Sequence, residues 1–113
     1  MIIGTKNLVN LTASPITVIL TVDQPNLVLE SEGDARTHEE RHQIESIGPI
    51  PVYDTSYDIV DGLPEEAPDT WYIVSATVAD AFRGKRSDLL VVTDPVRDDD
   101  GRPIGWRGFR RLV

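Results

Sequence analysis

The most specific chemical pattern in the chain is His38-Glu39-Glu40-Arg41-His42, which matches the H-E-x-x-H sequence of zinc hydrolases. On a helix, the two histidines would lie one turn apart and bind zinc while the glutamate activates a water molecule. Such a helix must be buried beside its metal, but every residue from 36 to 43 is polar and the chain has no third histidine. A zinc hydrolase that uses His38 and His42 is therefore kept only as a remote alternative.

Other residues suit phosphate binding better than catalysis. The segment Gly105-Trp106-Arg107-Gly108-Phe109-Arg110 alternates aromatic and arginine side chains, which stack on bases and pair with phosphates. The same pattern is also typical of an edge strand whose aromatic side chains pack inward. We take as candidates Arg36, Arg86, Arg97 and Arg107 for phosphate, Tyr72 and Trp106 for base stacking, and Asp88 for a sugar hydroxyl or an arginine.

Catalytic and cofactor motifs are otherwise absent from the sequence. The chain has no cysteine, which excludes disulfides, thiolate metal sites and cysteine nucleophiles. It also has no Walker loop and no G-x-G-x-x-G after a strand, so we expect no cofactor. A protein that is not an enzyme is favoured.

Charge is distributed unevenly along the chain. The net charge of −8 opposes non-specific binding to DNA or to anionic membranes. Residues 1–82 carry three basic and 14 acidic side chains (3 − 14 = −11), whereas residues 83–113 carry eight basic and five acidic ones (8 − 5 = +3). Either the two parts attract each other within one fold, or they recognise charged partners.

The length of 113 residues suits one domain, residues 1–113, in which folding buries about two thirds of the surface of the unfolded chain. The longest apolar run, residues 16–22, is too short to span a membrane, and no signal segment opens the chain. We therefore expect a cytoplasmic protein with no membrane partner.

Apolar and β-branched stretches predict a mostly β protein. The first two strands are expected to form a hairpin across Pro15, and Asp94-Pro95 is expected to end the last one. Asp99-Asp100-Gly101 predicts the tip of a further hairpin within residues 96–112. The predicted strands are residues 7–11, 16–22, 27–29, 50–53, 56–60, 71–74 and 88–92.

One helix is predicted over residues 76–83, with Ser75 as its N-cap and Gly84 just past its end. Residues 35–47 are ambiguous, because Asp34 and Gly48-Pro49 suit the two ends of a helix but the apolar stripe is too thin to hold one on a core. A long exposed strand is the other interpretation. The predicted fold class is α+β, a single small domain with a mostly antiparallel β sheet or partly open barrel and one short helix.

Segments such as Asn10-Leu11-Thr12, Tyr72-Ile73-Val74-Ser75 and Asp88-Leu89-Leu90 together resemble a family of small proteins from bacteriophages, prophages and bacteria, and the resemblance implies a location in the bacterial host cytoplasm. Members typically open with Asn-Leu-Thr-Pro-His-Pro, and this chain departs from that pattern at Ala13 and Ser14. The resemblance implies that Ala35-Arg36 starts a strand, but it implies no activity, because none is settled for the family. The matching segments are Asn10-Leu11-Thr12, Gly62-Leu63-Pro64, Tyr72-Ile73-Val74-Ser75, Arg86 with Asp88-Leu89-Leu90, and Arg97-Asp98 with Gly101.

These observations predict a non-enzymatic phage-type accessory protein that binds a phosphate-bearing, nucleotide-like small molecule, and that would sequester a signal of anti-phage defence. The alternative is an inhibitor or adaptor that binds a host protein through its acidic face, for example by mimicking nucleic acid. Homo-oligomer formation is compatible with both hypotheses.

Overall fold

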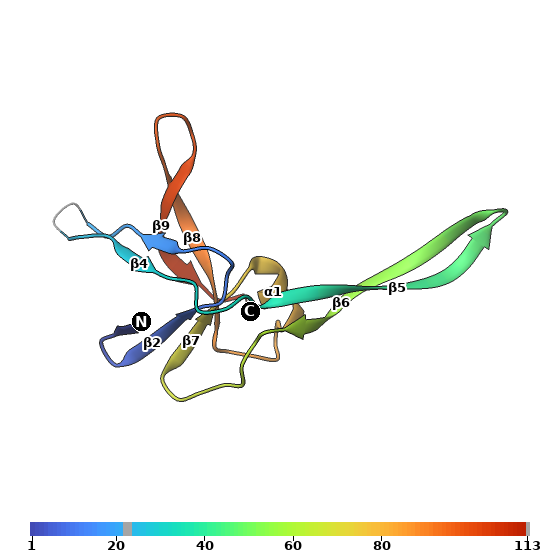
Figure 1. The fold of residues 1–113 in the computed structure, drawn as a ribbon, viewed down its shortest axis with the longest axis horizontal. Helices are drawn as coiled ribbons and strands as arrows, with labels where there is room; N and C mark the ends of the chain where they lie inside the picture. Colours follow the sequence, from blue (N-terminus) through green and yellow to red (C-terminus); the bar gives the residue numbers. More distant parts are fainter. Residues whose placement is uncertain (22–23, 113) are drawn as a thin grey trace.

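The computed structural model describes residues 1–21 and 24–112, apart from the side chains of residues 39 and 56–59 (Figure 1). Most of the described chain is strand, and α1 (Ala76–Ala81) is its helix. Among the described residues no helix is long and apolar enough to cross a membrane. The strands are β1 (Ile2–Ile3), β2 (Lys6–Asn10), β3 (Ile16–Val18), β4 (Leu27–Leu29), β5 (Arg36–Ile47), β6 (Ile50–Asp61), β7 (Thr70–Ile73), β8 (Leu89–Arg97) and β9 (Pro103–Arg110).

Seven strands form one curled sheet in the order β1-β2-β7-β8-β9-β3-β4. The chain after β4 returns to β2 through a bridge between Asn10 and Ser31, so the sheet curls into an open half-barrel. The α+β prediction of a partly open barrel with one short helix is therefore confirmed. The sheet is mixed, because β2–β7, β7–β8 and β3–β9 pair in parallel while the other neighbours are antiparallel.

The predicted hairpin between residues 7–11 and 16–22 is wrong, because β2 and β3 are not neighbours in the sheet. β2 pairs with β7, and β3 lies between β9 and β4. The segment after Asn10 turns back on that residue's own side chain, through hydrogen bonds with the Thr12 amide and the Ser14 carbonyl oxygen. β3 ends at Val18, so the predicted strand is wrong over residues 19–21, and its last residue, Val22, lies outside the described part of the chain.

The hydrophobic core has two parts, one on each face of β7. Ile73 packs inside the curl with Ile16, Val18 and Leu29. Its neighbours Tyr72 and Val74 point the other way, where they pack with side chains of α1 and of the start of β8. Because successive strand residues face opposite sides, this one strand joins both parts of the core.

The predicted helix is confirmed over Ala76–Ala81, two residues shorter than expected. Ser75 is the N-cap and accepts a hydrogen bond from the Val78 amide at 3.4 Å. The helix connects β7 to the parallel strand β8, as a parallel pair requires a crossover. Gly84 then takes a φ of 76°, which reverses the chain toward the loop that precedes β8.

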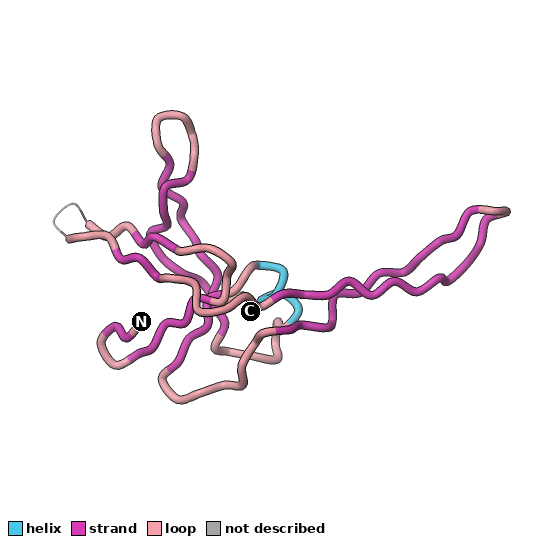
Figure 2. The backbone as a smooth tube through the Cα atoms, viewed as in Figure 1, coloured by secondary structure: helices cyan, strands magenta, loops and turns pink. Residues whose placement is uncertain are grey.

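Residues 36–47, for which the sequence allowed a helix or a strand, form the strand β5. β5 pairs only with β6 in a two-stranded sheet, hereafter the ribbon, which projects away from the half-barrel (Figure 2). The predicted break at Asp54-Thr55 is wrong, because β6 continues through it as one strand. A ribbon that is exposed on both faces has no core face to impose an alternation of apolar and polar residues. Residues 50–53 and 56–60 therefore looked like two separate strands in the sequence.

β8 and β9 form the predicted hairpin, whose tip carries Gly101 at a φ of 80°. The expected stop at Asp94-Pro95 is wrong, because β8 continues to Arg97 and Pro95 pairs with Trp106. β7 pairs with β8 only at Leu89 and Leu90. Beyond that point one edge of β8 is open, so a proline there removes no bond from the ladder.

Replacing Gly62 with alanine is expected to lower the free energy of unfolding by about 1–3 kcal/mol. Gly62 ends the ribbon with a φ of +80°, and a Cβ there would lie 2.6 Å from the carbonyl oxygen of Asp34. Gly48→Ala is the matched control, because Gly48 also has a positive φ but has no atom within 4 Å of an added Cβ. Urea unfolding should show the larger loss for Gly62→Ala, and equal losses would contradict the close approach at the base of the ribbon.

Candidate functional site

The structure disperses four of the predicted ligand-binding residues. Arg36 pairs with Asp34 at the base of the ribbon. Arg97 donates a hydrogen bond to the Gly101 carbonyl oxygen at 2.9 Å, near the tip of the β8–β9 hairpin. Trp106 and Arg107 are neighbours on β9, but Trp106 is half-buried and Arg107 is exposed. These four residues do not form one site.

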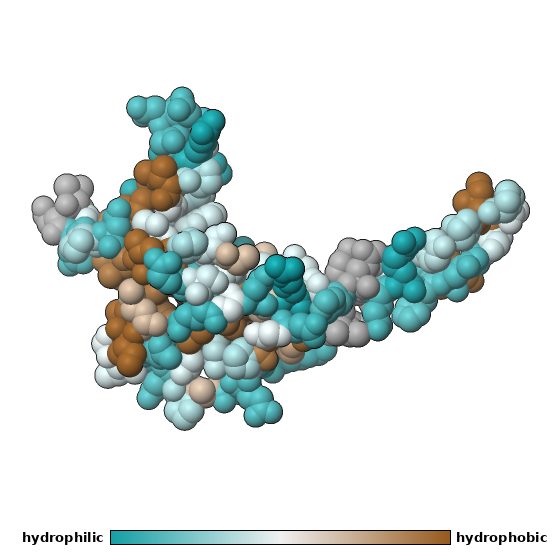
Figure 3. Space-filling model, in the orientation of Figure 1, coloured by the Kyte–Doolittle hydropathy of each residue, from teal (hydrophilic) through white to brown (hydrophobic). Residues whose placement is uncertain are grey.

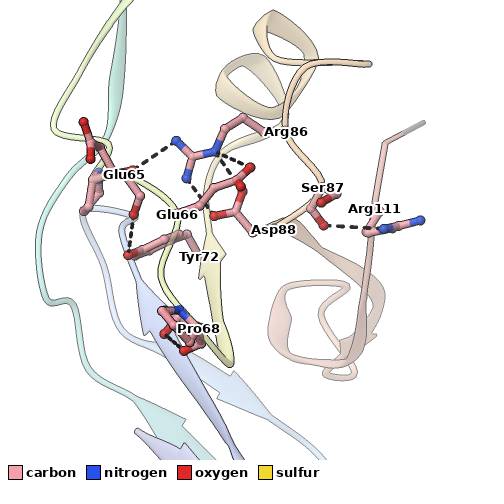
Figure 4. A network of polar contacts seen from close by, with 10 residues as sticks. Glu65, Glu66, Pro68, Tyr72, Arg86, Ser87, Asp88 and Arg111 are labelled. Carbon is pink, nitrogen blue, oxygen red and sulfur yellow. Dashed lines mark hydrogen bonds and ion pairs between the residues drawn. The ribbon is translucent and has the colours of Figure 1, made fainter.

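The other three predicted residues, Tyr72, Arg86 and Asp88, lie together beside α1 (Figure 4). Arg86 binds Asp88 with two hydrogen bonds, from Nε to Oδ1 at 2.8 Å and from Nη2 to Oδ2 at 2.7 Å. The two side chains are only 14% and 13% exposed. This bidentate geometry is the strongest form of an arginine–carboxylate pair.

Further contacts hold Arg86 in place. Its Nη1 donates to the Pro64 carbonyl oxygen at 3.0 Å, and its Nε lies 3.5 Å from Oε1 of Glu66. The guanidinium carbon is 5.9 Å from the centre of the Tyr72 ring. The Tyr72 hydroxyl in turn donates to the Glu65 carbonyl oxygen at 3.2 Å. The arginine therefore ties the acidic loop after the ribbon to the loop after α1.

The hydrogen bonds from Asp88 raise the pKa of Arg86 above its ordinary value, while partial burial acts in the opposite direction. Arg86 is therefore a fixed cation, and most of its donors are already used within the protein. Its positive charge is offset by the carboxylates of Asp88 and Glu66.

A cavity of about 440 Å³ opens next to this network, between the end of α1 and the chain that follows β9. Three cationic side chains line it, namely Lys85, Arg86 and Arg111, together with one acidic side chain, Glu66. Arg111 also reaches the Ser87 carbonyl oxygen at 3.5 Å. The apolar part of the lining comes from Ala79, Leu89 and Leu112. This volume lies within the usual range of small-molecule sites.

Sequence reasoning missed Lys85 and Arg111. Lys85 is next to the predicted Arg86 in sequence, so this adjacency could have identified it as a candidate. Arg111 is 24 residues from its contact at Ser87, and only the folding of the β8–β9 hairpin brings the two together.

Trp106 lines a second cavity of about 290 Å³, together with Arg110. Its other walls come from the loop after β2, the start of α1 and the middle of β8. An aromatic ring and an arginine are present there, as predicted for residues 105–110, but no other predicted ligand-binding residue lines this cavity.

The H-E-x-x-H segment lies on β5, not on a helix. Residues four apart on a strand are about 13 Å apart, much farther than one turn of helix. His38 pairs with Asp61 across the ribbon, and His42 lies 3.6 Å from Glu40. Within the described part of the chain, no group of three or more histidine or acidic side chains is placed to hold a metal. The local geometry that the zinc hypothesis requires is not formed.

Comparisons of the chain with protein-family models, with curated proteins and with solved structures found no match. The case for function therefore depends on the geometry of the cavity and on the charges around it.

Proposed function

We propose that this protein is a non-enzymatic binding protein whose 440 Å³ cavity takes a small phosphate-bearing, nucleotide-like ligand. The observation that carries the proposal is the convergence of Lys85, Arg86 and Arg111 on one cavity with an apolar floor. Lys85 and Arg86 are adjacent in sequence, and Arg111 joins them from the segment that follows β9. The local field is positive although the whole protein has a net charge of −8.

The three cations have different roles in this proposal. Arg86 is held by Asp88, which offsets its charge, so its role is to fix the wall of the cavity beside Lys85. Lys85 and Arg111 are exposed and, among the described side chains, form no ion pair, so they are placed to contact phosphate oxygens directly. Charge-assisted hydrogen bonds to phosphate are among the strongest that side chains make.

The apolar lining supplies the other half of the recognition. Ala79, Leu89 and Leu112 would take the base of a nucleotide while the cations hold its phosphate. A protein that binds such a ligand and leaves it unchanged would sequester it. The resemblance to phage and prophage proteins suggests a nucleotide signal of anti-phage defence as the ligand class.

Thermal denaturation with a panel of mononucleotides, linear dinucleotides and cyclic dinucleotides tests this proposal. At a ligand concentration of 100 times the dissociation constant, binding should stabilise the fold by about 2.7 kcal/mol. We expect Lys85→Ala and Arg111→Ala each to weaken binding by about tenfold or more, because each removes a charge-assisted contact.

Arg102→Ala is the matched control, because it removes one exposed cation at the tip of the hairpin, away from the cavity. It should bind like the unmodified protein. A flat response to the whole panel would exclude the nucleotide proposal, and an equal loss in all three variants would show that only the overall charge matters.

A further inference from the structure

The 290 Å³ cavity that Trp106 lines, hereafter the Trp106 cavity, has no part in the nucleotide site proposed above. It lies where β7 and β8 separate. The Val74 amide donates to the Leu90 carbonyl oxygen at 2.9 Å, and beyond this bond the chain after β7 enters α1 while β8 continues. The walls are the loop after β2, the start of α1, the middle of β8 and part of β9. Ligands of open sheets bind past the carboxyl ends of parallel strands, and β2 and β7 are parallel neighbours.

Hydrogen bonds within the protein hold the walls of the Trp106 cavity in place. On one side, the Thr12 hydroxyl donates to Oδ1 of the buried Asn10 at 2.6 Å, which fixes the loop after β2. On the other side, the Trp106 carbonyl oxygen accepts from the Ile19 amide at 2.8 Å. Gly105 permits this close approach of the two segments, because a Cβ there would lie 2.9 Å from a backbone oxygen of β3. The site is therefore formed before a ligand arrives, which lowers the entropy lost on binding.

Most of the lining is apolar. Figure 3 shows a hydrophilic tip on the β8–β9 hairpin, with apolar side chains below it, where the hairpin joins the half-barrel. Trp106 is half-buried and is the aromatic ring among the described lining residues. Aliphatic walls come from Pro15, Ile16, Val74, Val91 and Val92. These surfaces suit an apolar ring better than a sugar.

Arg110 is the charged side chain of this cavity, whose described lining contains no carboxylate. Arg110 is exposed and forms no ion pair with another described side chain. Trp106 and Arg110 are four residues apart on β9, so their side chains project from the same face of that strand. Gly108 lies between them and has no side chain to separate them. One cation beside an apolar wall selects a ligand that joins an apolar body to a single negative charge.

The backbone of β8 supplies a second donor. Peptide groups alternate along a strand, so the N–H and C=O of Val92 point to the same side as those of Leu90. The Leu90 carbonyl oxygen is bonded to Val74 on that side, whereas no described strand pairs with β8 there at Val92. Val92 lines the cavity. A carboxylate has two oxygens and can accept from an amide and a guanidinium at once.

We propose that the Trp106 cavity is a second binding site, which takes a small aromatic carboxylate. The carboxylate pairs with Arg110 and with the Val92 amide, and the ring packs against Trp106 and the aliphatic walls. The volume is close to the lower end of the range of small-molecule sites, about 300 Å³, so the ligand has a single ring system.

Titration with phenylacetate tests this proposal, with tryptophan fluorescence as the readout. The chain has two tryptophans, so a Trp71→Phe protein reports on Trp106 alone. We expect a saturable change with a dissociation constant below about 1 mM. Phenylacetamide has the same shape but no charge, and it should bind at least tenfold more weakly because it forms no charge-assisted bond. Calorimetric titration of the unmodified protein makes the same comparison without the Trp71 substitution.

Three variants locate the site. Arg110→Met should weaken the binding of phenylacetate at least tenfold and leave that of phenylacetamide unchanged. Arg107→Met is the matched control, because it removes the same charge from the same strand but projects from the opposite face and does not line the cavity. It should bind phenylacetate like the unmodified protein. Ala76→Leu enlarges an exposed residue in the cavity wall and should weaken the binding of both probes.

Three results would overturn the proposal. A protein that gives neither a fluorescence change nor heat with about 10 mM phenylacetate has no site for this class of ligand. Equal affinity for phenylacetamide would show that Arg110 does not select a charge. Phenylacetate binding that survives Ala76→Leu would place the ligand elsewhere, for example in the nucleotide cavity. Circular dichroism of each variant checks that lost binding does not reflect a lost fold.

Discussion

Asn10→Leu is expected to lower the free energy of unfolding by about 3–5 kcal/mol, because it removes four hydrogen bonds, one to the buried Leu29 carbonyl oxygen and three to partly buried groups of Thr12 and Ser14. Asn10 is 0% exposed. Its Nδ2 donates to the carbonyl oxygens of Ser14 and Leu29, at 2.9 and 2.8 Å. Its Oδ1 accepts from the amide and hydroxyl of Thr12, at 2.9 and 2.6 Å. Leucine has a similar volume but can replace none of these four bonds.

Urea unfolding followed by circular dichroism measures this loss. Asn26→Leu is the matched control, because Asn26 is exposed in the loop before β4, and its stability should change by less than about 0.5 kcal/mol. Thr12→Val should fall between the two, since it removes the hydroxyl and keeps the amide that bonds to Asn10. An Asn10→Leu protein as stable as the Asn26→Leu protein would show that the closure of the half-barrel does not depend on this side chain.

Asn10 illustrates how much of the fold was predictable from sequence. An asparagine at the end of an apolar strand is a recognisable anomaly, and residues 7–11 were predicted as that strand. Its partner Leu29 is 19 residues away, on a strand that the prediction placed correctly but could not orient. Pairing between distant strands leaves little trace in one sequence, because each strand shows only which of its faces is apolar.

Local features were predicted more accurately. Ser75 acts through its own neighbours as the N-cap, so the start of the helix could be placed from residues within a few positions, whereas the helix ends at the C-cap Phe82, two residues before Gly84. The tip of the β8–β9 hairpin was also found from a short pattern: the Asp98 carboxylate accepts from the amides of Asp100 and Arg102, at 3.0 and 2.9 Å. The order strand, helix, strand over residues 70–97 is the usual sign of a parallel pair, which β7 and β8 form.

There is a physical reason why the sequence did not decide between helix and strand for residues 35–47 of the ribbon. From Glu40 to Pro51 every residue is exposed, so neither face carries the alternation that identifies a half-buried strand. Only part of the candidate site could be predicted, because some of its residues are close in sequence and others are not. Arg86 and Asp88 are two residues apart and could be paired by inspection, whereas Arg111 joins the cavity only through the fold.

The pairing of Arg86 with Asp88 gives the second large expected effect. Arg86→Met should cost about 2–4 kcal/mol, because it leaves a carboxylate that is 13% exposed without its partner. Asp88→Leu should cost a similar amount by leaving the guanidinium unpaired. The double variant should lose less than the sum of the two, since neither charge then remains. Arg86→Lys should restore only part of the stability, because an ammonium group cannot donate the two parallel hydrogen bonds.

The dependence on pH separates this pair from a general charge effect. Asp88 raises the pKa of Arg86 in the folded protein, so the stabilisation is fully present below the ordinary arginine pKa and is lost only as pH rises through the higher folded-state value. The difference in unfolding free energy between the unmodified protein and Arg86→Met should therefore be constant between pH 7 and pH 10. A difference that declines across that range would mean that another titrating group carries the effect. Strict additivity in the double variant would show that the two residues stabilise the fold independently.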